Sequence, residues 1–230
     1  MYDHCPFCVR VRLALGLKNI KHKVVYLAND DIVTPTALVG KKVVPIFEDD
    51  GVAMKESLDI IAKIDSDPKY GPPGYFKPLS NRQDIKDWQT SVADNNRILQ
   101  RPRYMKSILP EFQQQDGKDA FVVNHPLPPY EKGDWQAMTN EERWEKYTSA
   151  YEMSFRLLDE TNKALAELDK LIFCTDYCTE GGLSYDDIDL WSRLRSVTIV
   201  RGIQWPLKLR AYMDKLSAMG DIPLYDSIAC

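Results

Sequence analysis

The feature that most constrains the fold of this chain is a change of pattern near residue 67. Before that point, segments typical of strands and of helices alternate, and from residue 80 onward almost every periodic segment is helical. The stretch between them is dense in proline, glycine and lysine, a composition that marks linkers. We therefore predict an α/β domain over residues 1–66, a linker over 67–79 and an all-helical domain over 80–230.

The first domain is expected to contain three helices and three strands. Proline at the first helical position and apolar residues every four positions predict a helix from Cys5 to about Lys18. The other expected elements are a strand over 22–27, a short helix from Thr34 to near Gly40, a strand over 42–48, a turn at Asp50–Gly51 with a return strand to Lys55, and a helix capped by Ser57. Only four residues precede Cys5, so a strand before it is either very short or missing.

Capping boxes mark the expected helix starts of the second domain. They are Ser80 with Gln83, Thr139 with Glu142, and Ser184 with Asp187. The helix that begins at Thr139 carries an apolar stripe as far as Leu168, which we interpret as core. Residues 124–135 contain three prolines and predict an irregular loop.

Composition excludes several classes of function. The formal net charge of −4 argues against nucleic-acid binding, which needs a surplus of lysine and arginine. No apolar run approaches the roughly 20 residues needed to span a bilayer. The N-terminus lacks the hydrophobic region of a secretory signal. We therefore expect a cytoplasmic protein that binds neither nucleic acid nor membrane.

The most specific motif is Cys5-Pro6-Phe7-Cys8. With Pro6 at the first helical position, Cys5 is expected at the N-cap, where unpaired amides and the helix dipole stabilise an anion. Such surroundings lower the pKa of a cysteine from about 8.5 to roughly 3.5–7.5. Cys8 follows one turn deeper on the same face, in more apolar surroundings. We predict that Cys5 is the attacking thiolate and Cys8 the resolving thiol of a redox pair.

Two other interpretations of the motif stay open at this point. A CxxC pair can be half of a zinc site, for which the other close pair would be Cys174 and Cys178, or the thiols can be inert. The helix context favours redox chemistry, and we assign no metal. The candidate cations for a positive rim that would favour the thiolate are His4, Arg10, Arg12, Lys41 and Lys42.

This motif and several other segments resemble the bacterial glutaredoxin 2 family, whose members are large glutaredoxins built like glutathione transferases. The matching segments, in chain order, are YDHCPFCVRVRLALGLKNI, NDD-x-x-TPT-x-x-VG, K-x-VPI, ES-x-DI, LDKLI, LSxDDI and GIxWP. The resemblance fades between about residues 113 and 150. It implies a thioredoxin-like N-terminal domain joined to an all-helical C-terminal domain, as in glutathione transferases.

The resemblance also implies a glutathione site. Pro45 is expected to follow a cis peptide bond, so that Val44 presents its backbone to the cysteinyl part of glutathione as an added strand would. Glu56 and Ser57 match the family's site for the γ-glutamyl group, and Phe7 is the aromatic residue between the two cysteines.

The resulting hypothesis is glutathione-dependent reduction of protein–glutathione mixed disulfides and of protein disulfides, by a protein that we expect to be a monomer. One rival is a glutathione transferase that conjugates electrophiles, with Cys5 only holding glutathione. The other rival is a non-enzymatic binding or membrane-associated module of the same architecture.

Overall fold

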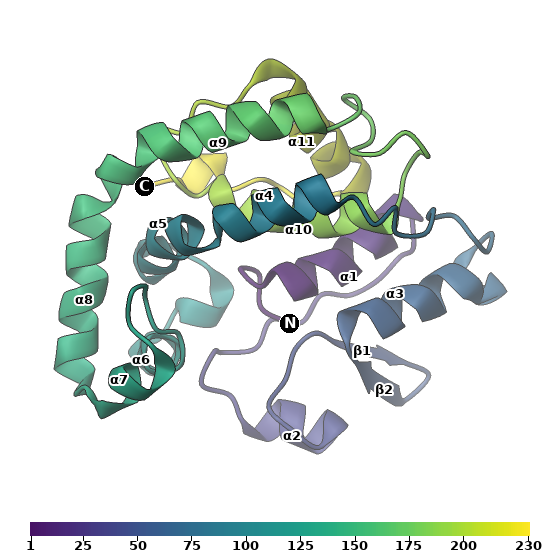
Figure 1. Ribbon diagram of the computed structural model, residues 1–230. Helices are drawn as coiled ribbons and strands as arrows, with labels where there is room; N and C mark the ends of the chain where they lie inside the picture. Colours follow the sequence, from purple (N-terminus) through teal and green to yellow (C-terminus); the bar gives the residue numbers. More distant parts are fainter.

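The N-terminal part of the chain forms a small hairpin sheet with three helices around it (Figure 1). The computed structural model describes all 230 residues. The elements of this part are α1 (Pro6–Leu17), α2 (Val33–Val39), β1 (Ile46–Asp49), β2 (Val52–Lys55) and α3 (Ser57–Ser66). Strands β1 and β2 pair antiparallel with Ile46 opposite Lys55. The predicted turn at Asp50–Gly51 is confirmed, with φ values of 50° and 76° at its two residues.

The predicted strand over 22–27 is wrong, because almost nothing lies beside it to complete a ladder of hydrogen bonds. The amino group of Met1 donates to the Val25 carbonyl at 2.8 Å, and the Leu27 amide donates to the Met1 carbonyl at 3.1 Å. A sheet needs a longer partner than this one residue. The predicted strand over 42–48 begins only at Ile46, because Pro45 has no N–H to donate to a neighbour.

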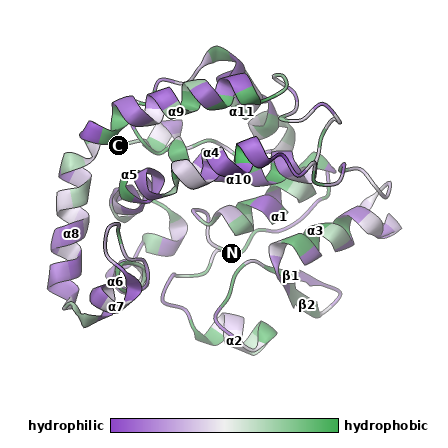
Figure 2. Ribbon diagram, in the orientation of Figure 1, coloured by the Kyte–Doolittle hydropathy of each residue, from purple (hydrophilic) through white to green (hydrophobic).

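The C-terminal part consists of helices. They are α4 (Gln83–Ser91), α5 (Ala93–Lys106), α6 (Gln115–Asn124), α7 (Lys132–Ala137), α8 (Asn140–Met153), α9 (Leu158–Leu171), α10 (Tyr185–Val197) and α11 (Leu207–Gly220). Short 3-10 turns cover Pro68–Tyr70, Pro110–Phe112, Ser154–Leu157 and Asp226–Ile228. In Figure 2 the outer helices α8 and α9 carry hydrophilic and hydrophobic residues together, as amphipathic helices do.

Two of the three predicted capping boxes are confirmed. Thr139 caps α8 and Ser184 caps α10, each in a reciprocal pair with the acidic residue three positions on. The box at Ser80 is wrong. The Ser80 amide instead donates to Asp186 at 2.7 Å, Asn81 takes a left-handed conformation with φ 58°, and α4 begins at Gln83.

Two further expectations for the helical part need correction. The long helix predicted from Thr139 is interrupted by a 3-10 turn at Ser154–Leu157, where the buried Ser154 hydroxyl donates to the Tyr151 carbonyl. The loop predicted over 124–135 ends early, because α7 begins at Lys132. Trp135 holds this helix in place: its side chain is fully buried and donates to the Val122 carbonyl at 2.8 Å.

The predicted linker packs against the helical part. Phe76 is buried, the Lys77 amide donates to the Leu183 carbonyl at 2.9 Å, and the Tyr185 amide donates back to Lys77 at 3.1 Å. Where one domain ends and the next begins stays a prediction. No helix of the structure combines the length and the apolar character that crossing a membrane requires.

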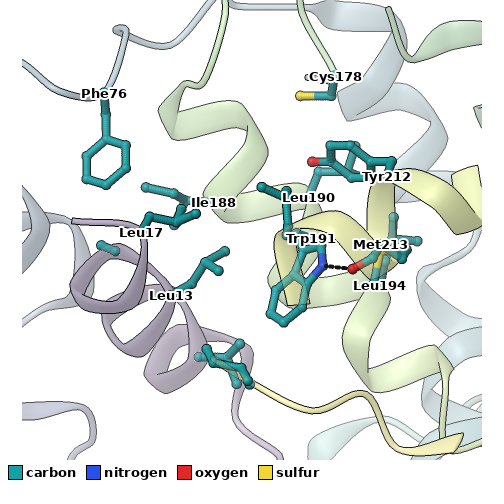
Figure 3. Close-up of a cluster of buried hydrophobic side chains, with 14 of the residues drawn as sticks. Leu13, Leu17, Phe76, Cys178, Ile188, Leu190, Trp191, Leu194, Tyr212 and Met213 are labelled. Carbon is teal, nitrogen blue, oxygen red and sulfur yellow. Dashed lines mark hydrogen bonds between the residues drawn. The ribbon is translucent and has the colours of Figure 1, made fainter. Parts of the chain in front are cut away.

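Helix α1 lies inside the molecule and joins the two parts. Its Leu13 and Leu17 pack in one cluster with residues of α3, α10 and α11 (Figure 3). In the same cluster the indole of Trp191 donates to the Met213 carbonyl at 2.9 Å, so its one polar group is satisfied. Because burial of each such side chain contributes about 1.5–3 kcal/mol, this cluster fixes α1 firmly.

The residues before α1 are tied to the far end of the chain. Asp3 accepts hydrogen bonds from the Arg195 guanidinium, at 3.1 Å to Oδ2, and from the Tyr225 hydroxyl, at 2.9 Å. Arg195 is itself 2% exposed, so its charge depends on this partner. These contacts fix the backbone that leads into the first helix.

Helix α1 approaches the end of α11 so closely that only glycine fits at the crossing. A Cβ atom added at Gly16 would lie 2.1 Å from the backbone oxygen of Gly220. Backbone atoms cannot move aside as a flexible side chain can, so a substitution here must separate the two helices.

We predict that Gly16→Ala destabilises the protein, although alanine is the better helix former by about 1 kcal/mol. The expected loss is about 1–3 kcal/mol, measured as a lower urea midpoint, because the methyl group overpacks the crossing. Gly133→Ala is the matched control: Gly133 lies in α7 with open space around its added Cβ, so its stability should be unchanged or slightly higher. Equal urea midpoints for Gly16→Ala and Gly133→Ala would contradict the close approach of α1 to the end of α11.

Candidate active site

Cys5 is the N-cap of α1, as the sequence predicts. Its backbone is extended, with φ −75° and ψ 116°, Pro6 follows as the first helical residue, and the Cys5 carbonyl accepts the first bond of the helix from Val9 at 3.0 Å. The thiol is partly exposed. It therefore combines access to solvent with a position over the unpaired amides of the first turn.

Cys8 lies one turn into the helix and is 1% exposed. Its sulfur accepts a hydrogen bond from the Tyr2 amide at 3.5 Å. Burial, together with the neighbouring Cys5 sulfur, raises the pKa of the Cys8 thiol well above its ordinary value. Cys8 is therefore protonated at neutral pH and available as a hydrogen-bond donor to Cys5.

The pKa of Cys5 is lowered to about 6. The largest cause is the hydrogen bond from the Cys8 thiol, which outweighs the opposing effect of burial; His4 and the backbone amides of Cys8 and Phe7 lower it further. From the sequence, the backbone amides of the first turn are expected to contribute most to this lowering of the pKa. In the structure Cys8 contributes most to lowering the pKa of Cys5, and the backbone amides contribute less.

His4 is held by a carboxylate that sequence analysis did not find. Glu111 Oε1 lies 2.5 Å from His4 Nδ1 and accepts the His4 amide at 2.8 Å. Glu111 is 1% exposed; burial alone would raise its pKa, but the hydrogen bonds and charge of His4 lower it. The two residues are 107 positions apart, and no local pattern marks Glu111. This contact holds the His4 ring next to Cys5.

The other cations of the predicted rim point to partners of their own. Arg10 pairs with Asp189 and stacks on the Phe7 ring at 4.7 Å, and Arg12 pairs with Asp3 at 3.3 Å. Lys41 pairs with Glu56 at 3.7 Å, while Lys42 is exposed without an ion pair. Three of these four charges are therefore neutralised by carboxylates, and none of the four residues lines the cavity in front of the thiol. The predicted positive rim is not found around Cys5.

A cavity of about 490 Å³ opens in front of Cys5, between the start of α1 and helices α4, α5 and α10. Phe7 and Val44 form its wall on the N-terminal side together with Cys5. The opposite wall comes from the helical part, in particular Asn96, Arg97, Gln100, Arg101 and Arg193. Residues of the first wall are predictable from the sequence motifs, but those of the second are not, because surface arginines on helices give no distinctive signal.

The remaining predicted site residues lie outside this cavity. The Val44–Pro45 peptide is cis, as expected, and Pro45 lines a second cavity of about 450 Å³, together with residues of α1, of the segment 20–25 and of β1. Glu56, not Ser57, is the N-cap of α3, with φ 71° and an exposed side chain. Ser57 is the first helical residue, is buried, and accepts from Arg10 at 3.5 Å. The predicted capping role of Ser57 is therefore wrong by one position.

Cys174 and Cys178 lie far along the chain from the motif; Cys178 belongs to the core, whereas Cys174 is partly exposed. Cys178 is fully buried, its amide donates to Asp187 at 2.7 Å, and burial raises the pKa of its thiol. The turn between the two cysteines is closed by the Cys174 amide, which donates to the Tyr177 carbonyl at 3.0 Å. The structure contains no group of three or more His, Cys, Asp or Glu side chains arranged to hold a metal ion.

Comparison with known proteins gives full-length matches. Residues 84–229 match the family described as "Glutaredoxin 2, C terminal domain", and residues 1–73 match "Glutathione S-transferase, N-terminal domain". Glutaredoxin 2 of Escherichia coli (strain K12) is 35% identical over 231 residues, which cover 100% of this chain and 98% of that protein. The predicted two-part fold class is confirmed by these matches.

A solved structure is similar over the same extent. The crystal structure of glutaredoxin 2 from Salmonella typhimurium in complex with glutathione superposes with a TM-score of 0.81 at 33% identity, covering 100% of this chain and 97% of the other. The similarity includes residues 113–150, where the sequence motifs alone did not reveal it.

We predict that alkylation of Cys5 by iodoacetamide follows the ionisation of a thiol of pKa about 6. The rate should rise with pH and reach half its maximum near pH 6, because only the thiolate reacts. Mass spectrometry of the modified protein identifies which cysteine has reacted. Preferential labelling of another cysteine below pH 7, or half-maximal labelling of Cys5 near pH 8.5, would contradict this assignment.

The effect of His4 on the pKa of Cys5 can be removed, without leaving a buried carboxylate unpaired, by combining His4→Gln with Glu111→Gln. If this raises the pKa of Cys5 by about one unit, the alkylation rate at pH 6 falls about fivefold, while the rate at pH 10 is unchanged. The pair Lys41→Gln with Glu56→Gln removes an exposed ion pair and serves as the control, with no expected shift. An unshifted profile in the first variant would show that His4 does not act on Cys5.

Proposed function

This chain belongs to the glutaredoxin 2 family of glutathione-dependent oxidoreductases, and on that basis we propose that it reduces protein–glutathione mixed disulfides with Cys5 as the attacking thiolate. One observation carries the proposal: the two thiols of the motif differ in both access and acidity. Cys5 faces a cavity and has a pKa lowered to about 6, whereas Cys8 is buried and protonated. Only the first can attack a disulfide presented from solvent.

The proposed reaction consists of two exchanges. The Cys5 thiolate attacks the glutathionyl sulfur of the mixed disulfide, a bond forms between these two sulfurs, and the substrate protein leaves as a thiolate. A second glutathione thiolate then attacks the glutathionyl sulfur held on Cys5. The two glutathiones leave joined as a disulfide, and the electron pair of the broken bond returns to Cys5 as the thiolate. The low pKa of Cys5 favours both its attack and its departure.

Cys8 serves a second substrate class in this proposal. When the substrate is a protein disulfide, Cys8 attacks the Cys5 mixed disulfide, which releases the substrate and leaves a Cys5–Cys8 disulfide for glutathione to reduce. The hydrogen bond between the two thiols supports this role, because it holds the Cys8 sulfur against Cys5 before the reaction begins.

We place the first glutathione against the N-terminal wall of the cavity. Phe7 and Val44 line the cavity beside Cys5, and the backbone of Val44 lies before β1, where it can pair with the peptide part of glutathione. Glu56 and Ser57 open α3, and the free amides of a helix start favour a carboxylate such as that of the γ-glutamyl group. The Salmonella relative was solved with glutathione bound, which supports this ligand.

A conjugating activity is the rival, and one assay pair separates it from the proposal. Purified protein is tested for glutathione-dependent reduction of a glutathionylated peptide and for conjugation of 1-chloro-2,4-dinitrobenzene. We expect reduction to dominate. Strong conjugation with negligible reduction would overturn the proposal in favour of a transferase in which Cys5 only holds glutathione.

Two single variants test the roles of the thiols. We predict that Cys5→Ser abolishes reduction of the glutathionylated peptide, with a loss of about 1,000-fold or more, because a serine hydroxyl is not ionised at neutral pH. Cys8→Ser should keep at least about a tenth of the activity on the mixed disulfide and lose activity on protein disulfides. The rates come from glutathione disulfide formation coupled to a reductase. The reverse order of losses would contradict the assignment.

A further inference from the structure

The wall of the cavity opposite Cys5 carries arginines and no acidic lining residue. None of the residues that line the cavity is an aspartate or glutamate, yet three are arginines: Arg97, Arg101 and Arg193. Two of these already have partners. Arg97 pairs with Asp94 at 2.7 Å and Arg193 with Asp189 at 3.0 Å, and both arginines are largely exposed.

Arg101 differs from the other two arginines because no carboxylate lies within ion-pair distance of it. It is half-buried, and its one hydrogen bond in the protein goes from Nη1 to the Pro126 carbonyl, in the loop after α6. Burial lowers the pKa of Arg101, which reflects how poorly its charge is solvated. A guanidinium has five N–H donors, so most of them have no protein acceptor here. A half-buried cation without a counter-charge, facing a cavity, is the arrangement expected of an anion-binding residue.

The chemistry at Cys5 indicates which anion this is. In the proposed function, on which this inference rests, the first glutathione occupies the wall formed by Phe7 and Val44. The second glutathione must enter the remaining space of the cavity for its sulfur to reach the glutathionyl sulfur on Cys5. It carries two carboxylates, and Arg101 is the unpaired cation in that space.

We propose that Arg101 binds a carboxylate of the second glutathione, the one that reduces the Cys5–glutathione disulfide. Arg101 touches this substrate through a charge-assisted hydrogen bond and takes no part in the sulfur chemistry. Its role is to raise the rate with glutathione above the rate with a thiol that has no carboxylate.

The test isolates the second exchange. Enzyme carrying Cys8→Ser is glutathionylated at Cys5, mixed rapidly with a reducing thiol, and the return of the free Cys5 thiol is followed. Each variant is measured with glutathione and with 2-mercaptoethanol, which has no charge. Adding Arg101→Gln should slow the reaction with glutathione about tenfold, corresponding to the loss of one hydrogen bond to a charged group, and change the rate with 2-mercaptoethanol less than twofold.

Lys106→Gln is the matched control, because it removes one positive charge from the same helix at an exposed position outside the cavity. Its ratio of glutathione to 2-mercaptoethanol rates should equal that of the parent. Equal slowing of both thiols by Arg101→Gln, or no slowing of either, would overturn the proposal. So would slowing confined to the first exchange with an acidic glutathionylated peptide, since Arg101 would then recognise the protein substrate. If the parent cannot be glutathionylated at Cys5 at all, the proposed function itself fails.

Discussion

The position of helix α1 between the two parts of the chain determines most of this structure. Leu13 and Ala14 on this helix have no exposed surface, and only its first turn reaches the cavity. Because Cys5 is the N-cap of α1, the packing of the buried end of this helix fixes where the reactive sulfur lies relative to both cavity walls. A small domain with a two-stranded sheet could hardly hold a helix so firmly by itself. The helical part supplies the missing contacts, through α10 and α11.

Local signals in the sequence were enough to predict many elements of the fold. The hairpin at Asp50–Gly51 and the capping boxes at Thr139 and Ser184 were correct because each depends on residues within a few positions of one another. The errors arose where distant residues decide. The segment 22–27 has strand-forming residues but too little backbone beside it, and the amide of Ser80 is bound by Asp186 from another helix. A single sequence does not reveal such competition.

The candidate site was predictable to a similar degree. The motif at Cys5 and Cys8 specified the helix position and the difference in burial between the two thiols, because a helix start has the same geometry wherever it occurs. Glu111 and Arg101 could not be predicted, since each is an ordinary charged residue until the fold brings it near Cys5. The role of each depends on the residue that it faces from the N-terminal part: His4 for Glu111, and Cys5 across the cavity for Arg101.

The contact between His4 and Glu111 has a consequence for the newly made chain. During synthesis the N-terminal segment emerges first, and for some time it has no partner from the helical part. Without Glu111, and without the packing that orders the start of α1, Cys5 would have the ordinary acidity of an unfolded thiol, which is mostly protonated at neutral pH. Cys5 would therefore become a strong nucleophile only after the helical part has docked, so that its activation coincides with completion of the fold.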